Sequence, residues 1–227
     1  MKTKIIGLVL LGLVSSAMAI GPGELDDRIR TLTVKFEELQ SQPDKAVPAD
    51  VLAKARGIIL LDRTKAGFLF AYQGGGGVAM VRDQATDAWS PVAFLDANQA
   101  SLGFQIGGEQ NFYAVLLMTT NATRLLTDPT FEFGGEARGT AGNVTSGVQT
   151  STPLDASILV YDDRQGLFGG AAIKGGGITP DAQADQIYYG QPVSVSGILF
   201  AHQVQRSQAA SDLARKIHEY AHHPSQQ

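Results

Sequence analysis

From residue 57 onward the sequence consists of short apolar runs separated by glycines. Residues 58–61 and 78–81 are two such runs, and the second follows four consecutive glycines at 74–77. Apolar runs of this length between turn-forming residues are typical of buried strands. Glycine supplies 26 of the 227 residues, above the roughly 7% of average proteins, and in such a setting it marks bends and close backbone approaches. The pattern predicts a β-rich α+β fold whose curved antiparallel sheet could close into a barrel or sandwich.

The glycine run itself predicts a hairpin. Residues 67–72 and 78–82 both have strand character, and the spacing places a turn at 74–77 between them. The stretch 134–151 is rich in Gly, Thr and Ser, and is predicted to be a long hairpin or a mobile loop. Further strands are predicted at 58–61, 89–95, 102–106, 112–118, 131–137, 158–162 and 167–174.

The residues before the glycine-rich part have a helical period. Between Glu24 and Gln40, apolar residues recur every three or four positions and share one helix face. The opposite face carries five acidic side chains beside three basic ones, whereas a helix for anionic lipid would be enriched in Lys and Arg. We therefore predict that this helix docks on the core. Other helices are predicted to start near residue 48 and to cover about 121–126, 182–188 and 207–222.

The first 19 residues have the layout of a secretory signal peptide. Lys2 and Lys4 precede an apolar run at 5–14, and Ala17-Met18-Ala19 provides small residues for cleavage. The apolar run is shorter than the roughly 18 residues that a membrane span requires. We expect cleavage after Ala19 and a periplasmic or secreted protein, with an N-terminal membrane anchor as the less favoured alternative.

Composition and missing motifs exclude several classes of function. The chain has no cysteine, hence no disulfide and no thiol nucleophile. Without Lys2 and Lys4, 16 of its 18 basic residues remain against 22 acidic ones, a net charge of −6, which argues against nucleic-acid binding. The glycine clusters match neither a phosphate-binding loop nor a nucleotide-binding fingerprint, and there is no nucleophile elbow. We therefore predict no cofactor.

One short motif near the C-terminus resembles a zinc-hydrolase helix. His218 and His222 are four residues apart on one helix face, and Glu219 lies between them as a possible general base. No third ligand is identifiable, and only four residues follow His223. We favour a solvated helix end where the histidines interact with the helix dipole, and keep a zinc hydrolase as an alternative. His202 is predicted to be a surface or capping residue.

Several segments occur in an order that resembles a known family. "ADVLAKARGIILLD" leads into "GFLFAYQGGGGVAMVRD", followed by "WSPVAF", "LGFQIGGE", "GLFGGAAIKGGGI", "YYGQPV" and "ILF" at 198–200. This order resembles the SYLF domain, a lipid-binding domain also described as an actin-regulator domain in fungal and animal proteins. The predicted organisation is a signal peptide at 1–19, an amphipathic helix at 20–47, a SYLF-like domain at 48–200, and a C-terminal helix and tail at 201–227.

The resemblance implies a β-rich fold with flanking helices, no catalysis, and binding to phospholipid head groups. Two features depart from the eukaryotic members: the N-terminal helix is nearly neutral rather than basic, and a signal peptide would separate the chain from actin and phosphoinositides. We therefore expect a non-enzymatic phospholipid-binding protein of the bacterial cell envelope. An envelope structural or protein-interaction module is the alternative. The lipid, the leaflet and the oligomeric state are left open.

Basic residues near the first strand are the candidate lipid contacts. Arg56 occupies the basic position of the family's A-[KR]-G pattern, and Arg82 precedes the strand at Trp89, where the family also carries a basic residue. Nearby, Phe68, Phe70 and Tyr72 share a strand face and are predicted to be core, as is Trp89. The full candidate set is Lys54, Arg56, Arg63, Lys65 and Arg82.

Overall fold

The computed structural model describes residues 20–63, 75–83, 85–97, 111–128, 131–133, 157–163, 166–167 and 176–222. The signal peptide predicted at 1–19, Lys65, the aromatic residues at 68–72, the strand predicted at 102–106 and the loop or hairpin predicted at 134–151 lie outside them. The helices are α1 (Pro22–Gln40), α2 (Ala49–Lys54), α3 (Thr120–Arg124) with the 3₁₀ turn η2 (Leu125–Thr127), α4 (Ala182–Tyr189), α5 (Val195–Leu199) and α6 (Gln208–His222). None of these described helices has the length and apolar character needed to cross a membrane.

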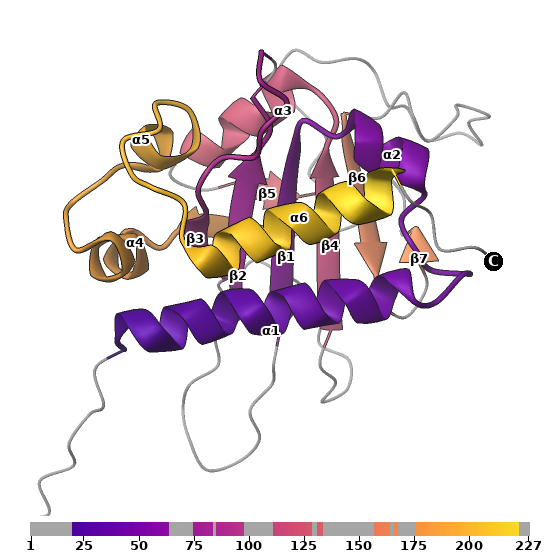
Figure 1. The fold of residues 1–227 in the computed structure, drawn as a ribbon, viewed down its shortest axis with the longest axis horizontal. Helices are drawn as coiled ribbons and strands as arrows, with labels where there is room; N and C mark the ends of the chain where they lie inside the picture. The colour runs from indigo at the N-terminus through magenta and orange to yellow at the C-terminus, as the bar shows by residue number, and fades with distance from the viewer. Residues whose placement is uncertain are drawn as a thin grey trace, which may run out of the picture.

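Eight strands form one antiparallel sheet in the order β5-β8-β3-β2-β1-β4-β6-β7 (Figure 1). They are β1 (Gly57–Arg63), β2 (Gly75–Val81), β3 (Ala93–Ala97), β4 (Asn111–Leu117), β5 (Phe131–Phe133), β6 (Ile158–Asp162), β7 (Gly166–Leu167) and β8 (Gly176–Pro180). The predicted α+β class with an antiparallel sheet and flanking helices is confirmed. The described strands do not close into a barrel or pack as two sheets. Helices, rather than other strands, cover both faces of the sheet.

The central strand β1 is buried on both faces. Ile58 and Leu60 belong to a core shared with α1, α2 and α6, whereas Ile59 and Leu61 belong to a second core shared with α3, η2 and α5. Alternate side chains of a strand point to opposite faces, so a strand covered on both sides must be apolar throughout. This explains the uninterrupted apolar run from which the strand was predicted.

Helix α1 docks on the sheet through its apolar stripe, as predicted. Leu25, Ile29, Leu32, Phe36 and Leu39 are each at most 1% exposed. Figure 1 shows α1 and α6 side by side across the strands. Both helices therefore share one core with the sheet. The domain boundaries predicted after residues 47 and 200 remain predictions.

Side-chain contacts between elements hold α1 and α6 in place. The rings of Phe36 in α1 and Tyr220 in α6 meet edge to face, with centroids 5.8 Å apart. Lys35 of α1 forms an ion pair of 2.9 Å with Asp62 of β1, and Lys216 of α6 pairs with Glu37.

The turn predicted at 74–77 is wrong for the three of these glycines that the structure describes. Gly75, Gly76 and Gly77 lie within β2, which pairs with β1 on one side and β3 on the other. A Cβ atom on Gly77 would lie 2.6 Å from the Leu60 carbonyl oxygen. On Gly76 it would lie 3.1 Å from the Arg28 guanidinium. These two glycines thus permit close approach of neighbouring groups rather than a reversal of the chain.

Other predicted elements are confirmed or shortened. β6 has the predicted bounds, and α3, α4 and α6 lie where helices were predicted, each within about two residues. The strand predicted from Trp89 begins only at Ala93 in β3, because Pro91 has no amide hydrogen for a sheet ladder; Trp89 instead forms an isolated bridge with Arg82. β8 and α5 were not predicted.

Replacing Phe36 with alanine should lower the free energy of unfolding by about 3–5 kcal/mol, because it removes a fully buried aromatic ring and leaves a cavity. Val34, which is 52% exposed on the same helix, provides a matched control, and Val34→Ala should change stability by no more than about 0.5 kcal/mol. Urea unfolding of both variants measures the difference. Equal effects would contradict the docked arrangement of α1.

Candidate functional site

Three of the predicted basic residues meet at one end of the sheet. Arg56 directly precedes β1; its amide donates to the Leu117 carbonyl at the end of β4, and its carbonyl accepts from the Arg82 amide after β2, both at 2.8 Å. Lys54 is the last residue of α2, two positions before Arg56. The structure therefore brings Lys54, Arg56 and Arg82 together.

The other two predicted residues do not join this group. Arg63 is the last residue of β1 and pairs with Asn111 at the start of β4. Because a strand rises about 3.3 Å per residue, its backbone lies roughly 20 Å from that of Arg56. The side chain of Arg63 and all of Lys65 lie outside the part of the chain that the structure describes. The backbone of Arg63 therefore lies at the opposite end of β1 from Arg56, and the role of each of the five residues remains a prediction.

Arg82 is largely committed to contacts within the protein. Its side chain is only 8% exposed. Its guanidinium donates to the Ala53 carbonyl near the end of α2 at 2.6 Å, forms an ion pair with Asp87, and lies 6.0 Å from the centre of the Trp89 ring. Trp89 is 7% exposed, which confirms its predicted place in the core. Arg82 thus fastens α2 and leaves Arg56 and Lys54 nearer the solvent.

Sequence reasoning missed a fourth basic residue, Arg124. Helix α3 follows β4 and begins with a cap in which the Thr119 hydroxyl accepts from the Ala122 amide. A Cβ atom on Gly57 would lie 2.9 Å from a methyl carbon of Thr123, so α3 packs directly against the start of β1. Arg124 follows Thr123 and is exposed. Only the pairing of β1 with β4 reveals that Arg124 and Arg56 lie at the same end of the sheet.

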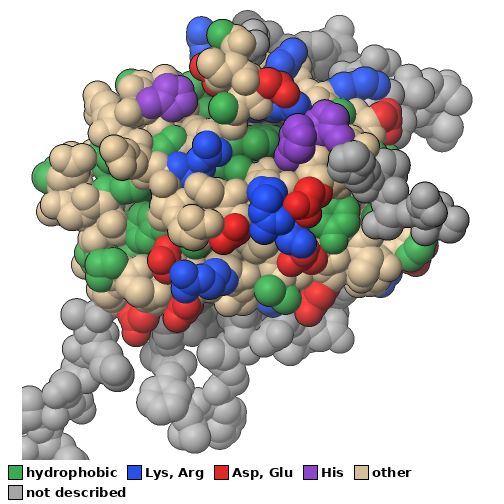
Figure 2. Space-filling view, viewed as in Figure 1, with side chains coloured by type: hydrophobic (Ala, Val, Ile, Leu, Met, Phe, Trp, Pro, Cys, Tyr) green, Lys and Arg blue, Asp and Glu red, His purple; other side chains and the backbone are tan. Residues whose placement is uncertain are grey.

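We call Lys54, Arg56, Arg82 and Arg124 the basic edge. Lys54 forms an ion pair with Asp50 at 3.4 Å, and Arg82 is paired as above. Arg56 and Arg124 make no ion pair with any of the described residues. In Figure 2, Lys and Arg side chains recur along the upper margin, with acidic side chains beside them. Within the basic edge, Arg56 and Arg124 are therefore the cations that have no acidic partner among the described residues.

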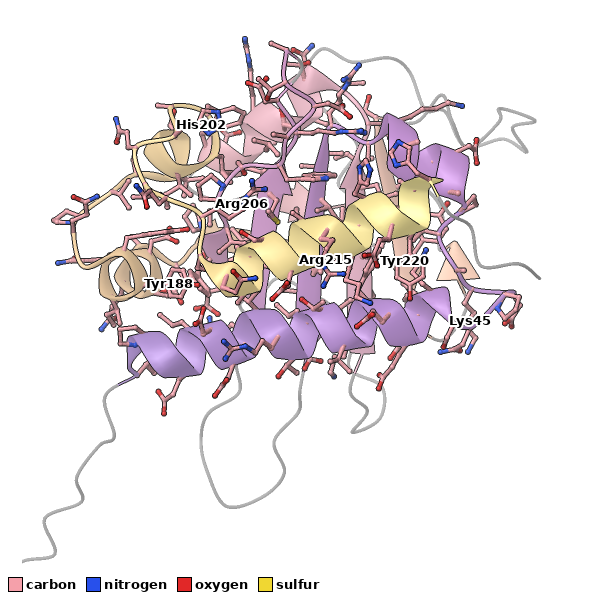
Figure 3. The ribbon with its side chains drawn as sticks, viewed as in Figure 1. Lys45, Tyr188, His202, Arg206, Arg215 and Tyr220 are labelled. Atoms are coloured by element: carbon pink, nitrogen blue, oxygen red, sulfur yellow. The ribbon has the colours of Figure 1, made fainter. Side chains whose placement is uncertain are left out.

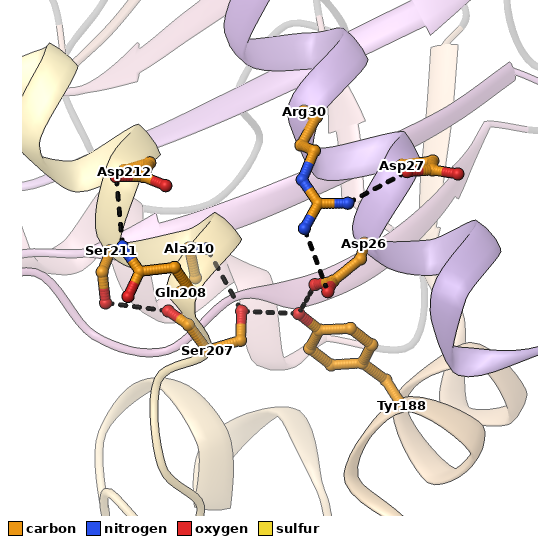
Figure 4. Close-up of polar contacts among 9 residues, drawn as sticks. All are labelled: Asp26, Asp27, Arg30, Tyr188, Ser207, Gln208, Ala210, Ser211 and Asp212. Carbon is orange, nitrogen blue, oxygen red and sulfur yellow. Dashed lines mark hydrogen bonds and ion pairs between the residues drawn. The ribbon is translucent and has the colours of Figure 1, made fainter.

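A second polar cluster joins α1, α4 and α6. The Tyr188 hydroxyl donates to the Asp26 carboxylate at 2.5 Å and lies 2.6 Å from the Ser207 hydroxyl, which in turn accepts from the Ala210 amide (Figure 4). Burial, followed by the hydrogen bond to Asp26, raises the pKa of Tyr188 to about 12. The tyrosine therefore remains a neutral donor that fastens the first turn of α1.

An open hollow of about 530 Å³ lies beside this cluster. No lysine or arginine is among its lining residues, and the nearby Asp26 carboxylate disfavours a phosphate. The basic edge is the better candidate for an anionic ligand. The hollow is lined by Pro22, Gly23, Asp26, Tyr188, Tyr189, Gln191, Gln203, Val204, Gln205 and Ser207.

Asp185 is a buried acid in α4. One carboxylate oxygen accepts from the Phe94 amide of β3 at 2.9 Å, and the other has no hydrogen-bond partner among the described residues. Burial is the main cause that raises the pKa of Asp185 to about 7, with the nearby Asp181 adding to it. The folded chain thus keeps a proton on this group over a range where the unfolded chain has lost it.

This proton makes stability depend on pH. Because the folded pKa of Asp185, about 7, exceeds the ordinary value of 3.8 for an aspartate, its contribution to the free energy of unfolding should fall as pH rises from about 4 to about 7 and then level off. Across this pH range the contribution of Asp185 to the free energy of unfolding changes by on the order of a few kcal/mol. Asp185→Asn keeps the acceptor for Phe94 without the charge, so it should flatten this decline and raise the melting temperature most at alkaline pH.

Thermal melts of both proteins across this pH range test the effect. Asp27→Asn, which changes an exposed acid on α1, provides the control. The same pH dependence in the parent and in Asp185→Asn would show that Asp185 is not the responsible group.

The motif of the zinc-hydrolase alternative lies in the last turns of α6. The Glu219 carboxylate accepts from Arg215 at 2.6 Å, and Lys216 lies 3.7 Å away. The hydrogen bond from Arg215 is the main cause that lowers the pKa of Glu219, which makes it a weak general base. No group of three His, Cys, Asp or Glu residues suited to a metal occurs among the described residues.

His202 lies at the surface, as predicted, with its ring 3.9 Å from Asp83 (Figure 3). Its backbone has a φ of 49°, in the left-handed region. This histidine is well separated from the end of α6 in the view of Figure 3.

An open antiparallel sheet covered by helices, with basic residues at one end, defines an α+β domain with a candidate anion-contacting edge. The family model Ysc84, described as "Las17-binding protein actin regulator", matches residues 98–220, more than half of the chain. The chain therefore belongs to the Ysc84 family, whose domain is the SYLF domain, and the resemblance noted in the sequence is confirmed.

Relatives from animals and yeast share this similarity. The rat and human proteins named SH3 domain-containing YSC84-like protein 1 are each 28% identical over 180 residues, covering 77% of this chain and 53% and 52% of their own lengths. LAS seventeen-binding protein 3 of Saccharomyces cerevisiae is 27% identical over 161 residues, covering 69% of this chain and 35% of its own length. The chain thus spans about half, or less, of these relatives.

Proposed function

We propose that this chain is a non-enzymatic phospholipid-binding protein of a bacterial cell envelope and that it contacts anionic head groups through the basic edge. The observation that carries this proposal is the position of Arg56 and Arg124. They lie at the same end of the sheet, and neither forms an ion pair with a described residue. A cation without an acidic partner keeps its full attraction for a phosphate group.

The overall charge makes the location of these cations important. Without residues 1–19 the chain has a net charge of −6, so an anionic membrane repels it as a whole. Binding then requires a local group of cations, since exposed charges act over a screening length of about 8–10 Å at physiological salt. Each cation near an anionic surface contributes about 1 kcal/mol.

The principal alternative is a protein-interaction module. It is favoured by the name of the family model, which describes binding to the protein Las17 and regulation of actin. Export, if it occurs, would place this chain away from actin, and for that reason we prefer the lipid. An envelope protein partner remains the outcome to expect if vesicles are not bound.

Replacing Arg56 and Arg124 together with glutamine should weaken binding to phosphatidylglycerol-containing vesicles by roughly thirtyfold, from two contributions of about 1 kcal/mol each. High salt should have a similar effect on the parent protein. Co-sedimentation with vesicles measures both effects. Arg30→Gln with Arg215→Gln is the matched control, because these exposed arginines lie on α1 and α6 in ion pairs, and it should leave binding nearly unchanged.

A second double variant separates the two ends of β1. Arg63→Gln with Lys65→Gln removes the predicted cations beyond the basic edge and should weaken binding less than the Arg56 and Arg124 substitutions. Binding that survives the Arg56 and Arg124 substitutions and high salt would overturn the proposed edge. An apolar site for acyl chains would then have to be considered.

Export should remove the first 19 residues. The mass of the protein recovered from a bacterial envelope fraction should correspond to a chain that starts at Ile20, because Ala17 and Ala19 provide the small residues that signal peptidase requires. The Ala19→Arg variant should block cleavage and serves as the control. An intact Met1 in the parent protein would contradict the proposed localisation.

A further inference from the structure

Two histidines lie together on the solvent side of α6. The rings of His218 and His222 are stacked, with centroids 4.1 Å apart and an angle of 27° between their planes. Both residues are exposed, whereas Leu213 and Ile217 on the other side of the helix are buried. Two histidine side chains in Figure 2 lie side by side at the surface. The pair is therefore open to a ligand from solvent.

A backbone contact determines which nitrogen of His222 can bind a metal. Its Nδ1 atom lies 3.0 Å from the His218 carbonyl oxygen. A carbonyl oxygen only accepts, so Nδ1 must carry the hydrogen, and in the neutral ring Nε2 then has a free lone pair. Metal-ligating histidines in proteins commonly donate their other ring nitrogen to a backbone carbonyl in this way.

The side chains around this pair that the structure describes are engaged in contacts of their own. Glu219 forms ion pairs with Arg215 and Lys216, and the ring of Tyr220 packs against Phe36 of α1. On the neighbouring helix α2, Asp50 and Lys54 pair with each other. The described part of the chain therefore offers two imidazoles and leaves the remaining coordination positions to water.

We propose that His218 and His222 bind one divalent transition-metal ion, preferentially Cu²⁺, through their Nε2 atoms. Imidazole is a good ligand for copper, and Cu²⁺ has the highest affinity of the first-row divalent ions for a given nitrogen site. With metal–nitrogen bonds of about 2.0 Å, two neighbouring ligands of a tetragonal ion lie about 2.8 Å apart. Stacked rings reach this span by tilting toward each other. The site is a two-histidine clamp rather than a hydrolytic zinc centre, since Glu219 plays no part.

Titration of the purified full-length mature chain with copper sulfate, by calorimetry in a weakly coordinating buffer, tests this proposal. We expect one Cu²⁺ per chain and an electron paramagnetic resonance spectrum with nitrogen couplings. His218→Asn and His222→Asn should each weaken binding by about tenfold or more, which corresponds to losing one of two protein ligands. Circular dichroism of each variant checks that the helix content is unchanged. Absence of stoichiometric copper binding, or unchanged affinity in both variants, would overturn the proposal.

Three further substitutions identify the ligands. His202→Asn and Glu219→Gln should leave the copper affinity within about twofold, because neither side chain belongs to the clamp. His223→Asn should behave in the same way. A tenfold loss in Glu219→Gln or His223→Asn, with no loss in His218→Asn, would assign the metal to other ligands and contradict the clamp.

Discussion

The structure depends on burying β1 from both sides. This strand pairs with β2 and β4 in the middle of the sheet, and its side chains enter two separate cores. Burial of that much apolar surface is the main favourable contribution to folding. It also forces helices onto both faces, which accounts for α1 and α6 on one side and α3 and α5 on the other (Figure 1).

Because helices cover both faces of the sheet, charged side chains are expected mainly at the ends of its strands. Arg56 and Arg82 follow this rule, since each lies where a buried strand begins or ends. The exceptions are polar groups drawn into the interior. Asp185 is one of them: it holds α4 on β3 through the Phe94 amide. Burying Asp185 costs the free energy of desolvating its carboxyl group, and this cost is smaller while the group keeps its proton.

Local patterns predicted the elements that depend on local chemistry. The 3.6-residue period gave α1 and α6, and the apolar run gave β1, because in each case burial imposes the period directly. The glycines at 75–77 were misread because their reason is not local: Gly77 faces the Leu60 carbonyl on another strand, and Gly76 faces Arg28 on a helix. The candidate site was predictable only in part for the same reason. Arg56 was found from its own segment, whereas Arg124 joins it through the pairing of β1 with β4.

Helix α6 shows how the same local sequence can serve packing and surface chemistry at once. Its spacing directs Ile217 and Tyr220 toward the core and α1, while His218 and His222 remain on the outer side. Glu219 lies between these two sides, and its ion pairs with Arg215 and Lys216 keep its pKa low. A zinc hydrolase needs that carboxylate free and beside the metal. The ion pairs of Glu219, rather than the spacing of the two histidines, therefore argue against a zinc-hydrolase role for this motif.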